Sequence, residues 1–136
     1  MFLVDTNVLL DIFTDDERWR PWSERAVADA VVAGGVGINP IIYAEASLTF
    51  GDAETLDRSL NALLVERLPL PWGAAFGAGR AYRRYRRAGG ARTSPLPDFH
   101  IGAHAATDGL PLVTRDAGPY RSYFPSVKLV TPGPRD

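Results

Sequence analysis

The sequence predicts an α/β protein, a three-layer α/β/α sandwich with helices on both faces of a central, mainly parallel sheet. Two observations favour this class: short apolar runs of strand length recur along the chain, and longer segments with helical apolar spacing separate them. Parallel strands need such long, usually helical, crossover connections. The chain has 136 residues, 46% of them hydrophobic and 23% charged. These values fit a single globular domain spanning residues 1–136.

The first part of the chain supplies two of the strands and three of the helices. The run MFLV, which ends at Asp5, predicts a buried strand, and residues 7–13 predict the helix that follows it. Pro21 marks the start of a second helix, because proline suits the first helical turn. The turn residues of GGVGINP bracket a strand at residues 36–38, and Pro40 opens a third helix through IIYAEASL.

The next segment predicts a helix and a strand. Asp52 is a suitable N-cap for a helix whose apolar stripe comprises Leu56, Leu60, Leu63 and Leu64. The run VERLPLP then predicts a short strand that its prolines bring to an end.

The last part of the chain contains two helices and two strands. A long helix is expected over residues 72–88, and GGARTSPLP is expected to be a loop. Asp98 then begins a helix that runs to about Thr107. LPLVT and VKLVTP are the last two predicted strands.

Charge is distributed unevenly along the chain. Residues 1–66 carry 12 acidic and 4 basic side chains, whereas residues 67–136 carry 4 acidic and 11 basic ones. Such asymmetry indicates a surface with an acidic side and a basic side, and the basic side could bind an anionic polymer. Cysteine is absent, which excludes disulfides and thiolate metal sites and is compatible with the cytoplasm, where we expect the protein to act. Neither a signal peptide nor a membrane span is predicted.

Two histidines, His100 and His104, raise the question of a zinc site. On a helix they lie at about 200° and 240° from Asp98, so they share a face that points away from that carboxylate. Zinc needs at least one further protein ligand, and the chain has no third histidine. Ile101 also stands where a zinc-protease helix has glutamate. We therefore expect both histidines to pack against other elements or to meet solvent.

Four carboxylates form the alternative site. Asp5 and Asp116 each follow a predicted strand, the end at which open α/β sheets bind ligands. Asp98 stands at a predicted helix start, where by itself it would serve as an N-cap. Glu45 interrupts an apolar helical segment, where it could equally face solvent. Because two of these acids follow separate strands and a third stands at a helix start, we expect their carboxylates to lie close together in the folded protein.

Carboxylates that converge repel one another and raise one another's pKa values. A hard divalent cation, Mg²⁺ or Mn²⁺, offsets that repulsion because it prefers oxygen ligands. Such a site suits phosphodiester hydrolysis, since the metal activates water and stabilises the leaving oxygen.

The motifs FLVDTNVLLDIF, PIIYAEASL, PDFHIGAHAA and LPLVTRD…YF, in this order, resemble those of a PIN-domain nuclease. The likeness is greatest to the VapC-type toxins of bacterial and archaeal toxin–antitoxin pairs. The motif VDTNVLL alone is moderately specific for this family, whereas all four motifs in this order are strongly specific for it. The resemblance extends from Phe2 to about Pro132, which is nearly the whole chain.

The resemblance implies a metal-dependent endoribonuclease with four catalytic acids at one edge of its sheet. Asp5 and Asp98 would hold Mg²⁺ or Mn²⁺, and Glu45 and Asp116 would complete the pocket or hold a second ion. The products would carry 5′-phosphate and 3′-hydroxyl ends.

The resemblance also assigns supporting residues and partners. Asn7 corresponds to a polar residue that supports the first aspartate, and Thr114 to the hydroxyl residue two positions before the last acid. RNA would be the substrate, a cognate antitoxin would block the pocket with its tail, and the protein would form a homodimer.

The segment GAGRAYRRYRRAGG predicts a basic helix face. Arginines recur there at helical spacing, and six of them occur between Arg80 and Arg92 without an intervening acid. Arginine binds phosphate and stacks on unpaired bases, although a solvated helix face is the alternative. The predicted RNA-contacting residues are Arg80, Arg83, Arg84, Arg87 and, beside the pocket, Arg115, for which a surface ion pair is equally compatible with the sequence.

Other functions fit the sequence less well. Haloacid-dehalogenase-type phosphatases need a second acid where Asn7 stands and a mid-chain lysine, but the only lysine is Lys128. Receiver domains need paired acids at the end of the first strand, and Asp5 has no acidic neighbour there. Two alternatives keep the same fold: a PIN-domain nuclease of RNA processing or decay, and a non-catalytic module that binds RNA or protein.

Overall fold

The computed structural model describes residues 1–90 and 96–133. The described chain alternates strands with helices, as the apolar runs predict. Its five strands are β1 (Phe2–Val4), β2 (Val36–Ile38), β3 (Val65–Arg67), β4 (Leu112–Val113) and β5 (Leu129–Val130). Its seven helices are α1 (Thr6–Phe13), α2 (Arg20–Ala33), α3 (Pro40–Ser47), α4 (Ala53–Ala62), α5 (Trp72–Arg87), α6 (Leu96–Asp108) and α7 (Gly118–Tyr123).

All five strands are parallel and form one sheet in the order β3-β2-β1-β4-β5. The chain therefore moves outward from β1 through β2 to β3, then returns to the other side of β1 to add β4 and β5. The point at which the order reverses lies between β1 and β4, where Leu3 pairs with Leu112 and Val4 with Val113. In open parallel sheets this switch point is where ligands bind.

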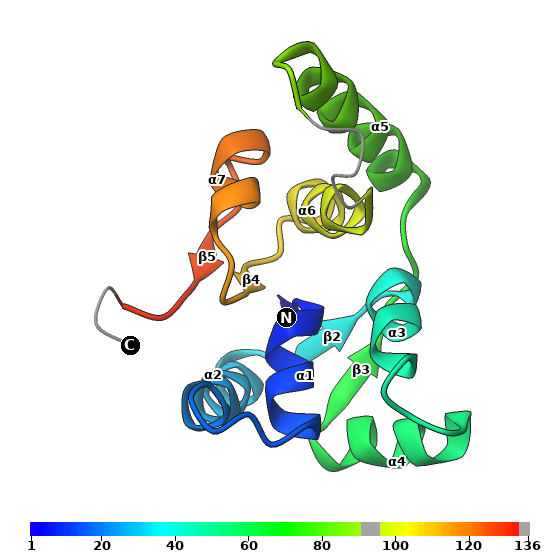
Figure 1. The fold of residues 1–136 in the computed structure, drawn as a ribbon, viewed down its shortest axis with the longest axis vertical. Helices are drawn as coiled ribbons and strands as arrows, with labels where there is room; N and C mark the ends of the chain where they lie inside the picture. The colour runs from blue at the N-terminus through cyan, green and yellow to red at the C-terminus, as the bar shows by residue number, and fades with distance from the viewer. Residues whose placement is uncertain (91–95, 134–136) are drawn as a thin grey trace.

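Helices cover both faces of the sheet, which confirms the predicted three-layer α/β/α architecture (Figure 1). In this view α6 and α7 lie on one side of the sheet, α5 packs outside α6, and α1 and α2 lie on the other side. The strands read as continuous apolar runs because both of their faces are buried. Leu3, Val4, Leu112 and Val113 of the two central strands are fully inaccessible to solvent.

Small side chains lie where α5 packs against α6. Ala74, Ala78 and Ala81 of α5 are fully buried. On α6, a methyl group added at Gly102 would lie only 2.3 Å from the Phe124 ring, so glycine alone allows that ring to pack there.

Three polar residues begin helices by capping them. Asp5, Asn39 and Asp52 each stand just before a helix, with side chains that accept a hydrogen bond from a free N–H of its first turn. Two of these caps, Asp5 and Asn39, also stand directly after β1 and β2. The ends of strands and the starts of helices therefore meet at one edge of the sheet.

Some predicted boundaries were wrong. The α6 helix begins at Leu96, so Asp98 lies in its first turn and is not its N-cap. Leu64 does not extend the apolar stripe of α4, because the helix ends at Ala62 and the Leu64 side chain is 66% exposed. The sequence also did not predict α7, since Gly118 and Pro119 at its start suggest a turn.

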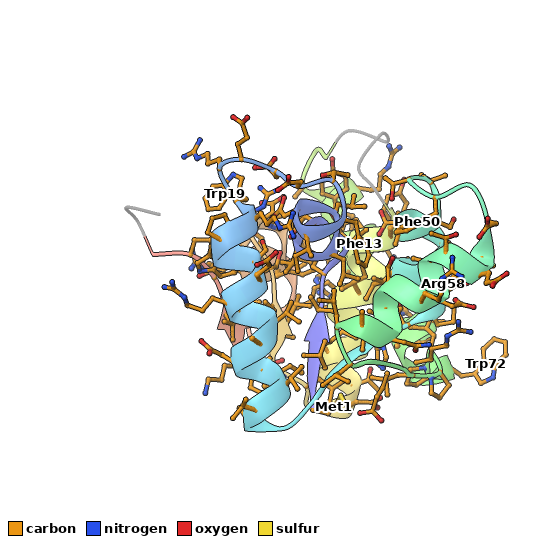
Figure 2. The ribbon with its side chains drawn as sticks, turned by 90° about the horizontal axis from the view of Figure 1, so that it is seen from below. Met1, Phe13, Trp19, Phe50, Arg58 and Trp72 are labelled. Carbon is orange, nitrogen blue, oxygen red and sulfur yellow. The ribbon has the colours of Figure 1, made fainter. Side chains whose placement is uncertain are left out.

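Aromatic residues pack at the outer ends of the helices. Phe13 and Phe50 lie edge to face with ring centroids 5.2 Å apart, and both are labelled in Figure 2. Trp72, by contrast, points away from the rest of the molecule and is 91% exposed (Figure 2). Within residues 1–90 and 96–133, no helix is long and apolar enough to cross a membrane.

Candidate metal centre

Asp5 lies at the switch point of the sheet, between the ends of β1 and β4. Its backbone N–H donates to the carbonyl of Val113 at 2.9 Å, which ties it to the neighbouring strand. The side chain is only 4% exposed. An isolated buried carboxylate is costly, so hydrogen bonds or a cation must compensate it.

Four donors surround the Asp5 carboxylate. Oδ1 accepts the backbone N–H of Thr6 at 2.7 Å. Oδ2 accepts from the Thr114 hydroxyl at 2.8 Å, the Tyr120 hydroxyl at 2.9 Å and Asn7 Nδ2 at 3.3 Å. Burial raises the pKa of Asp5, whereas the hydrogen bonds from Thr114, Tyr120 and Thr6 oppose part of that rise.

Thr114 links Asp5 to the loop that carries Asp116. The Thr114 side chain is fully buried, and its Oγ1 accepts the backbone N–H of Asp116 at 3.0 Å. Asn7 Nδ2 reaches the same hydroxyl at 3.4 Å, and Asn7 Oδ1 accepts the backbone N–H of Arg115 at 3.2 Å. Both predicted supporting residues, Asn7 and Thr114, therefore contact Asp5 directly.

Glu45 projects from α3 toward the start of α1. Its Oε1 accepts a 2.7 Å hydrogen bond from the Thr6 hydroxyl. Its negative charge contributes to raising the pKa of both Asp5 and Asp98. Glu45 is thus not a solvent-facing residue of α3 but a member of the same acidic group.

Asp98 is the acid most affected by the other three. Burial raises its pKa, and the charges of Asp5, Glu45 and Asp116 raise it further, to about 7. The four acids come from the junction of β1 and α1, from α3, from α6 and from the loop after β4, and 40 or more residues separate several of them in the sequence. We call Asp5, Glu45, Asp98 and Asp116 the acidic cluster.

The acidic cluster fits a hard divalent cation through its chemistry. All of its donors are carboxylate oxygens, and burial together with the charges of the other three acids raises the pKa of Asp98 to about 7. In the part of the chain that the structure describes, no three acidic or histidine side chains are placed close enough to hold a metal ion by themselves. Mg²⁺ does not need three such side chains, because it is usually held by one or two carboxylates together with water and substrate phosphate.

The sequence did not identify Tyr120. This residue lies on α7, a helix that was not predicted, and its side chain is 1% exposed. Burial and the charge of Asp5 raise the pKa of Tyr120 far above its usual range, so it stays protonated. The one signal in the sequence was its position four residues after Asp116.

His104 packs away from the acidic cluster, against Asn39 and Asp108. His104 is fully buried, with Nδ1 3.1 Å from Asn39 Nδ2 and Nε2 3.1 Å from Asp108 Oδ2. Because Asn39 Oδ1 caps α3 by accepting from Ile42 N–H, its Nδ2 must donate to His104. His104 thus packs between helices, as the helical projection predicted.

Four of the five predicted RNA-contacting arginines lie on α5, and the fifth, Arg115, lies in the loop after β4. Arg80, Arg83, Arg84 and Arg87 are exposed on α5. Of these, Arg80 stacks over Phe76 with its guanidinium carbon 4.7 Å from the ring centroid, and Arg84 Nη2 donates to the Tyr123 carbonyl at 3.0 Å. The sixth arginine of the segment, Arg92, lies outside the described residues. Arg115 forms an ion pair with Asp11, one of the two roles that the sequence left open.

Comparison with known proteins identifies the family. A family model described as PIN domain matches residues 2–124. No curated protein matches the chain.

Solved structures share the fold across almost the whole chain, at low sequence identity. VapBC2 from Rickettsia felis, bound to a DNA fragment from its promoter, has a TM-score of 0.70 and 16% identity over 97% of this chain and 98% of that one. A toxin–antitoxin complex from Klebsiella pneumoniae has a TM-score of 0.66 and 24% identity over 98% of both chains. FitAcB from Neisseria gonorrhoeae has a TM-score of 0.64 and 22% identity over 95% and 96%. From the family model and the shared fold, the chain belongs to the PIN domain family.

Proposed function

We propose that the protein is a Mg²⁺- or Mn²⁺-dependent endoribonuclease and the toxin of a toxin–antitoxin pair. One observation carries the proposal: four carboxylates gather at the switch point of a parallel sheet, where burial and the charges of the other three raise the pKa of Asp98 to about 7. Such an arrangement costs stability unless a cation binds, and strongly shifted carboxylates in a group mark functional sites.

Asp5 and Asp98 are the residues that would hold the cation, with Glu45 and Asp116 completing the pocket or holding a second ion. When bound, a divalent cation polarises the scissile phosphate and makes water a better nucleophile. The carboxylates keep the cation in place, and one that is not a ligand accepts the proton that the attacking water releases. The expected products have 5′-phosphate and 3′-hydroxyl ends.

The basic residues of α5 supply the complementary charge for RNA. The arginines at its C-terminal end lie beside α7, because Arg84 donates to the Tyr123 carbonyl. Tyr123 in turn packs on Phe99, with ring centroids 5.6 Å apart, and Phe99 is next to Asp98. A phosphate backbone that reaches the acidic cluster can therefore contact these arginines as well.

The partners in the proposal come from the similar structures. The Klebsiella pneumoniae structure is described as a toxin–antitoxin complex, and the Rickettsia felis structure as VapBC2. By this likeness we propose a cognate antitoxin. The homodimer and the site of action in the cytoplasm, where RNA is accessible, are proposed from the resemblance of the sequence motifs to VapC-type toxins. A PIN-domain nuclease of RNA processing, or a non-catalytic module of the same fold, is the alternative.

The test is cleavage of labelled single-stranded RNA with Mg²⁺ or Mn²⁺. We expect cleavage that EDTA abolishes and that Asp98→Asn reduces by at least about 100-fold, because a metal ligand is lost. Asp29→Asn, an exposed aspartate of α2, is the control for charge. Products ending in 2′,3′-cyclic phosphate would contradict the proposed hydrolysis. Metal binding without cleavage of any RNA would instead favour the binding module.

A further inference from the structure

Tyr120 is the one aromatic side chain whose hydroxyl contacts the acidic cluster among the described residues. Its hydroxyl lies 2.9 Å from Oδ2 of Asp5, and its side chain is 1% exposed. A tyrosine hydroxyl keeps its proton at neutral pH, so Tyr120 donates and Asp5 accepts. This hydrogen bond joins residues separated by 115 positions in the sequence.

The two oxygens of Asp5 are in unequal surroundings. Oδ2 receives three donors, from Thr114, Tyr120 and Asn7. Oδ1 receives a single donor, the backbone N–H of Thr6. Because each carboxylate oxygen offers about two lone-pair directions, Oδ2 is saturated and Oδ1 retains one that is unused.

The surroundings of Tyr120 hold its ring in one place. Tyr120 belongs to α7, and its backbone carbonyl accepts the N–H of Phe124 at 2.8 Å. Phe124 is itself buried against Gly102 of α6, and Arg84 of α5 donates to the carbonyl of Tyr123. The hydroxyl thus reaches Asp5 from a helix that contacts both α5 and α6.

We propose that Tyr120 is a positioning residue that saturates Oδ2 of Asp5 and so makes Oδ1 the oxygen that binds the divalent cation. The inference rests on the proposed metal-dependent function. Without the Tyr120 hydroxyl, Oδ2 keeps one short hydrogen bond, from Thr114 at 2.8 Å, and the longer one from Asn7 at 3.3 Å, so it competes more strongly with Oδ1 for the cation. Partners of this kind, which orient a ligand without contacting the metal, commonly change metal affinity by 10- to 100-fold.

The test compares Mn²⁺ affinity in Tyr120→Phe, Tyr123→Phe and the unaltered protein, by electron paramagnetic resonance of free Mn²⁺. Tyr123 lies on the same helix, and its hydroxyl has no hydrogen-bond partner among the described residues, which makes it the matched control. We expect Tyr120→Phe to bind Mn²⁺ at least about 10-fold more weakly. Tyr123→Phe is expected to bind as the unaltered protein does. Thermal unfolding without metal is measured in parallel, because a purely structural role would lower stability and leave the affinity of the folded protein unchanged.

Three outcomes overturn the inference and differ from one another. Equal affinity in Tyr120→Phe and the unaltered protein removes the role of Tyr120 but leaves the proposed function intact. Equal weakening in both tyrosine variants assigns the effect to α7 packing and not to the hydroxyl. Failure of the unaltered protein to bind Mn²⁺ removes the metal site, and the positioning role with it.

A second measurement applies if Tyr120→Phe does not fold. 3-Fluorotyrosine incorporated at position 120 retains both ring and hydroxyl, and its ¹⁹F resonance reports on the hydrogen bond. We expect this resonance to shift when Mg²⁺ is added, whereas the same label at Tyr123 shifts less. A label at Tyr120 that does not respond while Mg²⁺ binds would overturn the inference.

Discussion

Arg115 and Asp11 form a two-point ion pair beside the acidic cluster. Nε of Arg115 lies 2.5 Å from Oδ2 of Asp11, and Nη2 lies 2.8 Å from Oδ1. The Asp11 side chain is 3% exposed and also accepts from the Ser23 hydroxyl at 2.7 Å. Because Arg115 stands between Thr114 and Asp116, the pair fastens the loop after β4 to α1.

The first prediction concerns this ion pair. Arg115→Ala leaves the buried Asp11 carboxylate without its cation, and we expect the free energy of unfolding to fall by about 2–4 kcal/mol. Urea unfolding measures this, with Arg121→Ala as the control because Arg121 is an exposed arginine of α7. If Arg115→Ala kept its stability and lost only RNA affinity, Arg115 would be a substrate-binding residue and not a loop anchor.

The second prediction concerns the repulsion within the acidic cluster. Asp98 loses its proton near pH 7 when folded but near the usual aspartate pKa of 3.8 when unfolded. Between these values the folded state binds more protons, so metal-free stability falls as the pH rises. Asp98→Asn removes the repelled charge and should stabilise the metal-free protein at pH 8 by about 1–2 kcal/mol, less than the full shift because solvent partly screens the carboxylate.

Thermal unfolding at pH 8, with EDTA and then with Mg²⁺, tests this. Mg²⁺ should stabilise the unaltered protein and have little effect on Asp98→Asn. The control Asp29→Asn should respond to Mg²⁺ as the unaltered protein does. A loss of metal-free stability in Asp98→Asn would mean that Asp98 makes favourable contacts that outweigh the repulsion.

The third prediction concerns the buried His104. Burial lowers its pKa below the usual 6.5, although Asp108 partly opposes this. As the pH falls below 6.5 the unfolded chain takes up a proton that the folded protein does not, so His104 makes the protein less stable in acid. Protonation would also turn Nδ1 of His104 from an acceptor into a donor, so Asn39 Nδ2 would lose its hydrogen-bond acceptor.

Urea unfolding between pH 5 and 7.5 isolates this effect. Asp98→Asn serves as the background, because the titration of Asp98 has the opposite sign in this range. Adding His104→Gln, which is neutral at every pH, should remove the loss of stability that the background variant shows as the pH falls below 6.5. An unchanged pH profile would show that another group is responsible.

The fourth prediction concerns RNA binding by α5. Arg80 and Arg84 already contact Phe76 and the Tyr123 carbonyl, whereas Arg83 and Arg87 are exposed on the same helix. Arg83→Ala with Arg87→Ala should weaken RNA binding and reduce the salt dependence by about two released counterions. Fluorescence anisotropy in a salt series measures both.

Arg58→Ala is the matched control for the α5 arginines. Arg58 is exposed on α4, far from α5 in the fold, and pairs only weakly with Glu54 at 3.3 Å. Its loss should leave the salt dependence unchanged. If the α5 double variant bound RNA with the same salt dependence as the Arg58 variant, the α5 arginines would be an ordinary solvated face.

The sequence predicts those parts of the fold that depend on local patterns. The strand at Val36–Ile38 was predicted with its observed bounds, because glycines and a proline bracket one short apolar run. Asp52 was predicted as an N-cap and accepts the N–H of Thr55 at 2.7 Å. Local apolar spacing and capping determine both features within a few residues of chain.

Features that depend on tertiary contacts were not predictable in this way. The start of α7 contains glycine and proline, so nothing local indicates that Tyr120 is buried against Asp5. The pairing of Arg115 with Asp11 spans 104 residues and was only one of two open alternatives. That Asp5 and Thr114 are partners follows from the pairing of β1 with β4, and strand order is not encoded in the spacing of apolar residues.

The reversal of strand order between β1 and β4 also has a consequence for the time at which the pocket forms. During synthesis Asp5 leaves the ribosome before its partners Thr114 and Tyr120, which follow 109 and 115 positions later. Contacts so distant in sequence form late and slowly. A nascent chain in which β4 and α7 are not yet synthesised therefore carries Asp5 without these two hydrogen-bond donors, and the acidic cluster is incomplete until they emerge.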